Sequence, residues 1–301
     1  MNRLETRFND IVFKNPVLTA SGTFGFGREY GAFYDLERLG GLCTKGLTLE
    51  PRPGNTGTRI WETPSGIINS IGLENPGVDA FLEKEWPHLK ALDTVTVINV
   101  GGKDEASYLG AIEKLNAIDA KLIELNISCP NVKAGGMAYG IRAEMAADIT
   151  EKVVAVSKHP VMVKLSPNVE DIVAIAKACE EAGASGISLI NTVQAMAVDY
   201  KKKQIVFDNV YAGLSGPAVK PIALRMTHQV CKAVTIPVMA MGGISTWEDA
   251  LEFIMVGATC VQVGTMNFVD PLAPIKVVEG LQAYCEVENL ENIDAVRGIL
   301  L

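Results

Sequence analysis

Short runs of apolar and β-branched residues recur along the whole chain, and polar or glycine residues bound each of them. Runs of this length with such boundaries are typical of buried β-strands. The pattern predicts eight strands, at Val17–Ala20, Leu42–Lys45, Val95–Val100, Leu122–Ile127, Val161–Leu165, Gly186–Asn191, Val238–Gly242 and Cys260–Gly264.

The segments between these runs carry a helical spacing of apolar residues instead. In residues 172–179 the apolar positions recur at i, i+3, i+4 and i+7, and Gly183 ends this predicted helix. A second predicted helix begins at Ser245, where Ser245-Thr246-Trp247-Glu248 has the spacing of a capping box, and it ends at Gly257. Alternating strands and helices indicate a parallel sheet.

Eight strands that alternate with helices predict an α/β chain folded as a single (β/α)8 TIM barrel, one domain over residues 1–301. An open doubly wound sheet would alternate too, but Gly25 and Gly27 lack the third glycine of a dinucleotide-binding fingerprint and no helical pattern follows them at once. Three long connections, 46–94, 128–140 and 192–216, each follow a predicted strand. We expect them to be loop insertions on the C-terminal face, where barrels form their active sites.

The composition fits one large globular domain, with 301 residues of which 48% are hydrophobic and 21% charged. A net charge of -8 with dispersed Lys and Arg argues against nucleic-acid binding. The chain has no signal-peptide core and no run of about 18 apolar residues. We therefore expect a cytoplasmic protein that does not bind membranes.

The six cysteines contain no CxxC pair and the three histidines lie far apart, so neither a disulfide framework nor a metal site is signalled. Most of the cysteines are predicted to be small buried apolar residues. Cys129 differs, because it follows a predicted strand and lies between Asn126 and Asn131. The loop that it enters contains Gly135, Gly136 and Gly140. A free thiol at the mouth of a pocket can act as a base or a nucleophile.

Polar residues end most of the predicted strands, where a core would not select them. In a barrel these strand ends converge on one mouth, so the residues are predicted to share a pocket. A single Asn could equally be a solvated strand end, but coincidence is a poor explanation for six on different strands. The six are Ser21, Lys45, Asn99, Asn126, Lys164 and Asn191.

The two lysines of this set differ in how much they require a ligand. Lys164 lies within the apolar run Val161–Leu165, so its ammonium needs an anionic or electron-rich partner, such as the N1–C2=O2 edge of a flavin. Lys45 invites the same interpretation, with a structural salt bridge as the alternative.

Glycines follow the last two predicted strands, at Gly242–Gly243 and at Gly264–Thr265. Barrels commonly bind a phosphate there with backbone N–H groups, and glycine allows the backbone to approach it closely. One such turn could be a plain turn, but two on adjacent strands favour phosphate. The implied cofactor carries a single phosphomonoester, as FMN does.

At these residues the chain resembles the class 1 dihydroorotate dehydrogenases, from Asn15-Pro16 to about Pro271. Together the motifs that carry the resemblance are specific, although each alone is weak. They are Lys45-Gly46, Asn69-Ser70-Ile71-Gly72-Leu73-Glu74-Asn75-Pro76-Gly77, Asn126-Ile127-Ser128-Cys129-Pro130-Asn131 and Asn191-Thr192.

The resemblance implies a role for each of these positions. Cys129 would remove the C5 proton of dihydroorotate while the C6 hydride passes to FMN. The substrate would be held by Lys45, Asn69, Ser70, Ile71, Gly72, Leu73, Asn126, Asn191 and Thr192. The FMN would be held by Ser21, Lys45, Gly46, Asn99, Asn126, Lys164, Ile190, Gly216, Gly242, Gly243, Gly264 and Thr265.

Within class 1, residues 20–27 and Glu50-Pro51-Arg52-Pro53-Gly54-Asn55 are similar to the NAD-linked class 1B type. That type implies a homodimer of this chain with a separate electron-transfer subunit that carries FAD and a [2Fe–2S] cluster, because this chain has motifs for neither. The expected role is the oxidation of (S)-dihydroorotate to orotate in UMP biosynthesis. The alternatives are a fumarate-linked class 1A enzyme, another FMN or phosphosugar barrel, and a scaffold subunit without activity.

Overall fold

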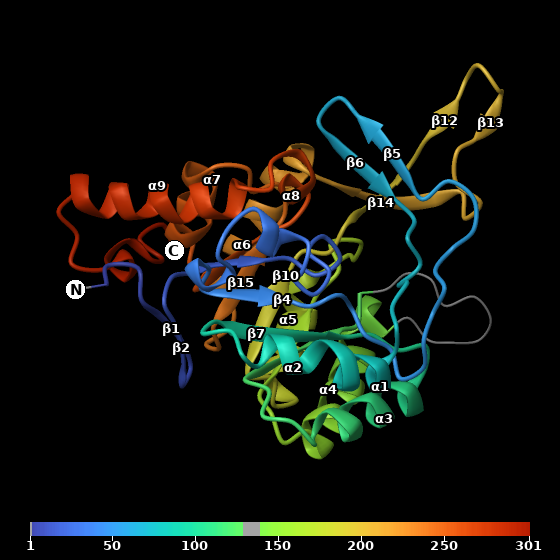
Figure 1. The fold of residues 1–301 in the computed structure, drawn as a ribbon, viewed down its shortest axis with the longest axis horizontal. Coiled ribbons are helices and arrows are strands. Elements are labelled where there is room, and N and C mark those ends of the chain that lie inside the picture. The colour runs from blue at the N-terminus through green and yellow to red at the C-terminus, as the bar shows by residue number, and fades with distance from the viewer. Residues whose placement is uncertain (1, 129–138) are drawn as a thin grey trace.

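The structure is a computed structural model that describes residues 2–128 and 139–301. A closed barrel of eight parallel strands forms its centre, in the order β10-β15-β16-β3-β4-β7-β8-β9 (Figure 1). This confirms the predicted barrel and excludes the open sheet. The barrel strands are β3 (Val17–Thr19), β4 (Gly41–Cys43), β7 (Val95–Val100), β8 (Leu122–Asn126), β9 (Val161–Lys164), β10 (Gly186–Leu189), β15 (Val238–Met241) and β16 (Cys260–Val263).

Helices surround the barrel and connect its strands (Figure 1). The connection from β3 to β4 contains only the 3-10 turns η1 (Tyr30–Ala32) and η2 (Leu36–Arg38). The remaining helical elements are α1 (Val78–Ala80), the π-helical turn η3 (Phe81–Glu85), α2 (Trp86–Leu89), α3 (Glu105–Leu115), η4 (Tyr139–Ile141), α4 (Ala143–Val156), α5 (Ile172–Glu181), η5 (Pro217–Val219), α6 (Lys220–Cys231), α7 (Trp247–Met255), α8 (Met266–Val269), α9 (Ala273–Val287) and η6 (Ile293–Val296). None of the helices in the described ranges is long and apolar enough to span a bilayer.

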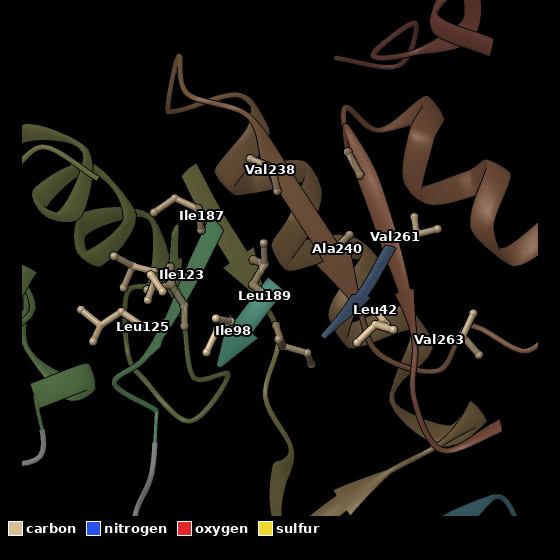
Figure 2. Packing of buried hydrophobic residues seen from close by; sticks show 14 of the residues in the cluster. Leu42, Ile98, Ile123, Leu125, Ile187, Leu189, Val238, Ala240, Val261 and Val263 are labelled. Carbon is tan, nitrogen blue, oxygen red and sulfur yellow. The ribbon is translucent and has the colours of Figure 1, made fainter. Parts of the chain in front are cut away.

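Alternate residues along each barrel strand face the helices and pack into one large apolar cluster. Figure 2 shows part of this layer, including Ile123 and Leu125 of β8 and Val261 and Val263 of β16. The side chains between them face the inside of the barrel, because successive residues of a strand point to opposite faces. Each strand therefore contributes to two cores.

The inside of the barrel changes from apolar to polar toward the mouth. A hairpin of β1 (Thr6–Phe8) and β2 (Ile11–Phe13) brings Phe8 and Phe13 into the apolar cluster at the bottom. Leu122, Met162 and Cys260 belong to that cluster, and two residues further along the same strands stand Glu124, Lys164 and Gln262. The polar group thus lies one inward-facing layer above the apolar plug.

Two of the long connections form a second sheet, which the sequence analysis did not predict. The antiparallel strands β5 (Ile60–Thr63), β6 (Gly66–Asn69), β11 (Val193–Met196) and β14 (Tyr211–Ser215) pair in the order β11-β14-β6-β5. A hairpin of β12 (Val198–Asp199) and β13 (Gln204–Ile205) extends from it. In Figure 1 these strands project from one side of the barrel. The loops expected on the C-terminal face are therefore partly strands.

The predicted helix boundaries need one correction. Helix α5 begins at Ile172 after the side chain of Asp171 caps it, which agrees with the predicted spacing. Helix α7 has its capping box one residue later than predicted, with Thr246 as the N-cap and Asp249 as the reciprocal partner. Ser245 and Glu248 are therefore not the capping pair. Thr246 and Asp249, each one residue later, form the same reciprocal bonds.

Candidate active site

A cavity of about 510 Å³ opens at the C-terminal ends of the barrel strands, beneath the second sheet. Its lining includes all six polar strand-end residues, which confirms that they share one pocket. Every other described residue of the predicted substrate and FMN sets lines it too: Gly46, Asn69, Ser70, Ile71, Gly72, Leu73, Ile190, Thr192, Gly216, Gly242, Gly243, Gly264 and Thr265. Cys129 and Asn131 lie outside the described residues.

Lys164 forms an ion pair that the sequence analysis did not predict. Its ammonium lies 3.6 Å from Glu124 Oε2, and it donates a hydrogen bond to Ser21 Oγ over 3.2 Å. The side chains of Lys164 and Glu124 are 5% and 0% exposed, so water does not screen the attraction between them. The buried ammonium of Lys164 therefore has an anionic partner within the chain itself, the carboxylate of Glu124.

Glu124 lies at the centre of a polar cluster below the cavity. It accepts hydrogen bonds from Asn99 Nδ2 at 2.5 Å, from Cys43 Sγ at 3.3 Å and from Gln262 Nε2 at 3.3 Å. Burial opposes ionisation of Glu124, but the attraction of Lys164 and the bond from Asn99 outweigh it and hold the pKa of the carboxyl below its usual value. The cluster therefore contains a carboxylate.

Lys45 lies at the end of β4 and forms no ion pair with any described residue, which leaves the salt-bridge alternative without support. Burial lowers the pKa of its ammonium, the carboxylate of Glu74 opposes this shift, and the charge of Arg59 adds to it. A half-buried cation without a partner is stabilised by an anionic ligand. Lys45 therefore gives the cavity a free positive charge.

The turns that follow β15 and β16 have the features of an anion site. Gly242 and Gly243 have φ values of +128° and +78°, a region that favours glycine. No described residue accepts a hydrogen bond from the backbone N–H groups of Gly243, Gly264 or Thr265. These donors are therefore available to an anion, as oriented N–H groups are in phosphate sites.

The segment that follows β6 forms another wall of the cavity. Asn69 donates a hydrogen bond from Nδ2 to the carbonyl oxygen of Gly213 in β14 over 3.1 Å. Gly72 and Leu73 both have positive φ, and a Cβ on Gly72 would lie 2.4 Å from Asn55 Oδ1. Asn55 packs so closely against Gly72 that a side chain at position 72 has no room, and this packing fixes the backbone of the turn.

Side-chain hydrogen bonds join the ends of β8 and β10. Ser128 donates to Asn126 Oδ1 over 2.6 Å and accepts from Asn191 Nδ2, while Asn191 Oδ1 accepts from the N–H of Thr192 at 2.8 Å. Both groups of the Asn191 side-chain amide are therefore already bonded within the protein. Among the described residues Asn126 Nδ2 has no acceptor, so it can donate to a ligand, and Ser128 bonds to two residues that line the cavity.

Several lining residues were not predicted from the sequence. Asn168 follows β9 and joins it to the second sheet by donating to the carbonyl of Thr192 at 2.9 Å and accepting from the N–H of Gln194 at 2.8 Å. The rule that selected the other strand ends could have found Asn168. It could not have found Ser215 and Tyr211, because they line the cavity from β14, outside the barrel.

Comparison with known proteins identifies the family of the chain. The family model for dihydroorotate dehydrogenase matches residues 3–285. The chain belongs to the dihydroorotate dehydrogenase family. Relatives of similar length bear the name dihydroorotate dehydrogenase B (NAD(+)), catalytic subunit. One from Petrotoga mobilis is 52% identical over 99% of this chain and 100% of its own length.

Two further relatives with the same name agree with this match. The protein from Thermoanaerobacter pseudethanolicus is 50% identical over 99% of this chain and 98% of its own. The protein from Bacteroides thetaiotaomicron is 48% identical over 100% of this chain and 99% of its own. The described cysteines are free thiols, as predicted for most of them: Cys43, Cys179, Cys260 and Cys285 are buried and Cys231 is partly buried.

Proposed function

We propose that this chain is the catalytic subunit of an NAD-linked dihydroorotate dehydrogenase, which oxidises (S)-dihydroorotate to orotate in UMP biosynthesis. The observation that carries the proposal is the cavity, which gathers every described residue of the expected substrate and FMN sets. The names of full-length relatives at about half identity support the NAD-linked type over the fumarate-linked alternative. We also propose that residues 1–301 form one domain, and a cytoplasmic location stays a prediction.

The residues present fit FMN. The unbonded N–H groups of Gly243, Gly264 and Thr265 suit a phosphate, and buried Asn99 Oδ1 has no hydrogen-bond partner in the described chain, so it can accept from a ligand. The Lys164 ammonium offers positive charge at the floor of the cavity. When bound, FMN would supply the acceptor for the hydride that leaves the substrate.

Dihydroorotate would occupy the part of the cavity near β6. Its carboxylate suits the free charge of Lys45, and the turn 69–73 and the Nδ2 group of Asn126 offer donors and acceptors for the carbonyl and N–H groups of its ring. Removal of a proton beside a carbonyl requires a base, and we assign this role to Cys129 from the family motif. Cys129 comes three residues after Asn126, which lines the cavity, and its own position lies outside the described residues.

Electrons must leave this chain for NAD to be reduced. We propose an electron-transfer subunit with FAD and a [2Fe–2S] cluster, as the term catalytic subunit in the names of the relatives suggests. We further propose a homodimer of this chain. The second sheet and its hairpin support this proposal, because Ile60, Met196, Val198, Ile205 and Tyr211 are exposed there.

The cofactor and the partner can be tested together on the purified chain. We expect a yellow protein that releases FMN on denaturation and that reduces NAD only after the electron-transfer subunit is added. Stoichiometric FAD in the chain would contradict the cofactor assignment. Rapid NAD reduction by a preparation shown to contain no other protein would contradict the need for a partner.

A further inference from the structure

The polar cluster beneath the cavity holds a carboxylate that the proposed reaction does not use. We propose that Glu124 is a positioning residue for the flavin, which holds the Lys164 ammonium charged in the barrel and leaves the side-chain oxygen of Asn99 free for a ligand. The inference rests on the proposed function, because it needs a flavin above Lys164 and Asn99.

The contact with Lys164 is the first support. Glu124 is fully buried, and Lys164 is nearly so, with 3.6 Å between Nζ and Oε2. A buried lysine without a counter-ion loses its proton readily, and such lysines are known with pKa values of about 5 to 6. Ser21 is the other side chain in the described chain that bonds to Nζ, and a hydroxyl supplies no charge. The charge of Lys164 therefore depends on Glu124.

The contact with Asn99 is the second support. A carboxylate accepts hydrogen bonds and donates none, so the 2.5 Å bond fixes the Nδ2 group of Asn99 toward Glu124. The Oδ1 atom then has no partner among the described residues, although it is buried and Asn99 lines the cavity. One carboxylate on β8 thus prepares an acceptor on β7 and a cation on β9, the strands on either side of its own.

Among the described residues, the groups that face Lys164 and Glu124 add no further charge to the floor of the barrel. From β4, Cys43 donates to Glu124, and burial, followed by the charge of Glu124, raises the pKa of that thiol well above its usual value. From β16, Gln262 donates to Glu124 Oε1, and from β10 the buried Ser188 is neutral. Glu124 is therefore the carboxylate that balances the Lys164 ammonium among these groups.

Replacement of Glu124 by glutamine tests this dependence, because it removes the charge and keeps an oxygen that can accept from Asn99. Where the variant keeps the Lys164 cation, at low pH, the cluster gains a net positive charge and should hold reduced, more negative flavin at least as tightly as the wild type. Where the variant loses that cation, at high pH, the reduced flavin should be held less tightly. The two pH profiles should therefore cross.

The measurement is the reduction potential of bound FMN, in place of turnover, for wild type and Glu124→Gln between pH 6 and 9. This potential reports the ratio of the dissociation constants of oxidised and reduced FMN. At pH 9 we expect the variant to favour the oxidised form at least tenfold more than the wild type does, about 30 mV for two electrons. At pH 6 the difference should vanish or reverse.

Gln262→Met is the matched control, because it removes a hydrogen bond to the same carboxylate and leaves both charges in place. Its profile should run parallel to that of the wild type. Glu124→Asp keeps the charge and should restore the wild-type profile, and it serves as the test if Glu124→Gln does not fold. A Glu124→Gln profile parallel to the wild type, or an Asp variant that behaves like a neutral residue, would overturn the inference. Failure of the wild type to bind FMN would instead contradict the proposed function.

Discussion

Single residues decide whether the cavity can take a phosphate, and Gly264 provides the cleanest test. A Cβ at this position would meet only Ala20 Cβ, at 3.5 Å, and no positive φ demands glycine. The fold therefore tolerates alanine, whereas the added methyl group would enter the space beside a phosphate. We expect Gly264→Ala to keep wild-type stability and to bind FMN about tenfold or more weakly, a loss of about 1.4 kcal/mol.

The control for this variant is Gly31→Ala, on an exposed turn where a Cβ would meet nothing within 4 Å. It should alter neither stability nor FMN affinity. Denaturant unfolding of the FMN-free chain and fluorescence titration with FMN measure the two properties. Equal FMN affinity in Gly264→Ala and the wild type would place the phosphate elsewhere.

Lys45 predicts how ligand binding depends on pH. Burial depresses the pKa of its ammonium, and an anionic ligand raises that pKa by stabilising the charged form. Binding of orotate is then linked to protonation of Lys45, so the affinity is full below the depressed pKa and falls as the pH rises through it. We expect calorimetry from pH 6 to 9 to show this fall in the wild type and a weak, flat profile in Lys45→Gln. A wild-type affinity that rises with pH would exclude this role.

The six polar residues that the apolar pattern identified share one property: each lies at or just after the end of a strand whose apolar pattern is clear. Lys164 and Asn99 stand out because a polar residue interrupts an apolar run. Glu124 interrupts such a run as well, but its role depends on partners from β4, β7, β9 and β16, and only the closed barrel brings these together. A buried charge can be seen in a sequence, whereas its neighbours cannot.

At the scale of elements, the eight barrel strands were predictable and the second sheet was not. Barrel strands are buried on both faces, so they read as continuous apolar runs. Strand β5 is largely exposed and β14 is only partly buried, and β14 pairs with β6, which lies far away in sequence. Their pairing therefore leaves little local pattern.

The start of α7 was predicted one residue too early, because Ser245 and Thr246 are both good caps.

The start of α7 also supports the proposed phosphate site, through Asp249. Its carboxylate accepts from the N–H groups of Ser245 and Thr246 at 2.8 and 3.0 Å, and it pairs with Lys220 of α6 at 2.5 Å. Lys220 packs where a Cβ of Gly243 would lie. Asp249 thus fixes both sides of the glycine turn.

We expect Asp249→Ala to lower the free energy of unfolding by about 1–2 kcal/mol, through loss of the cap and of a partly buried ion pair. FMN should also bind less tightly, because the turn loosens. Glu252→Ala is the matched control: Glu252 pairs with the same lysine at 2.8 Å but contacts no backbone donor of the turn, so the loss should stay below about 1 kcal/mol. Equal effects of the two variants in urea unfolding would show that the cap does not stabilise the turn.

At the scale of the whole molecule, one barrel mouth holds an anion site on β15 and β16, a charged floor on β8 and β9, and a substrate wall after β6. Flavin and dihydroorotate would meet between them, and Cys129 is the base that we propose. An ordinary thiol has a pKa of about 8.5, so the active thiolate should increase as the pH rises. The half-reaction between substrate and flavin needs no other subunit.

The most direct test is therefore anaerobic stopped-flow mixing of the isolated, FMN-loaded chain with dihydroorotate across a pH series. We predict that the flavin absorbance is bleached with one orotate formed per FMN, and that the rate increases with pH. Cys129→Ala should bind FMN normally and react about 100-fold or more slowly, the usual scale for loss of a general base. A loaded chain that dihydroorotate does not bleach would contradict the proposed function, and an unchanged rate in Cys129→Ala would contradict the assigned base.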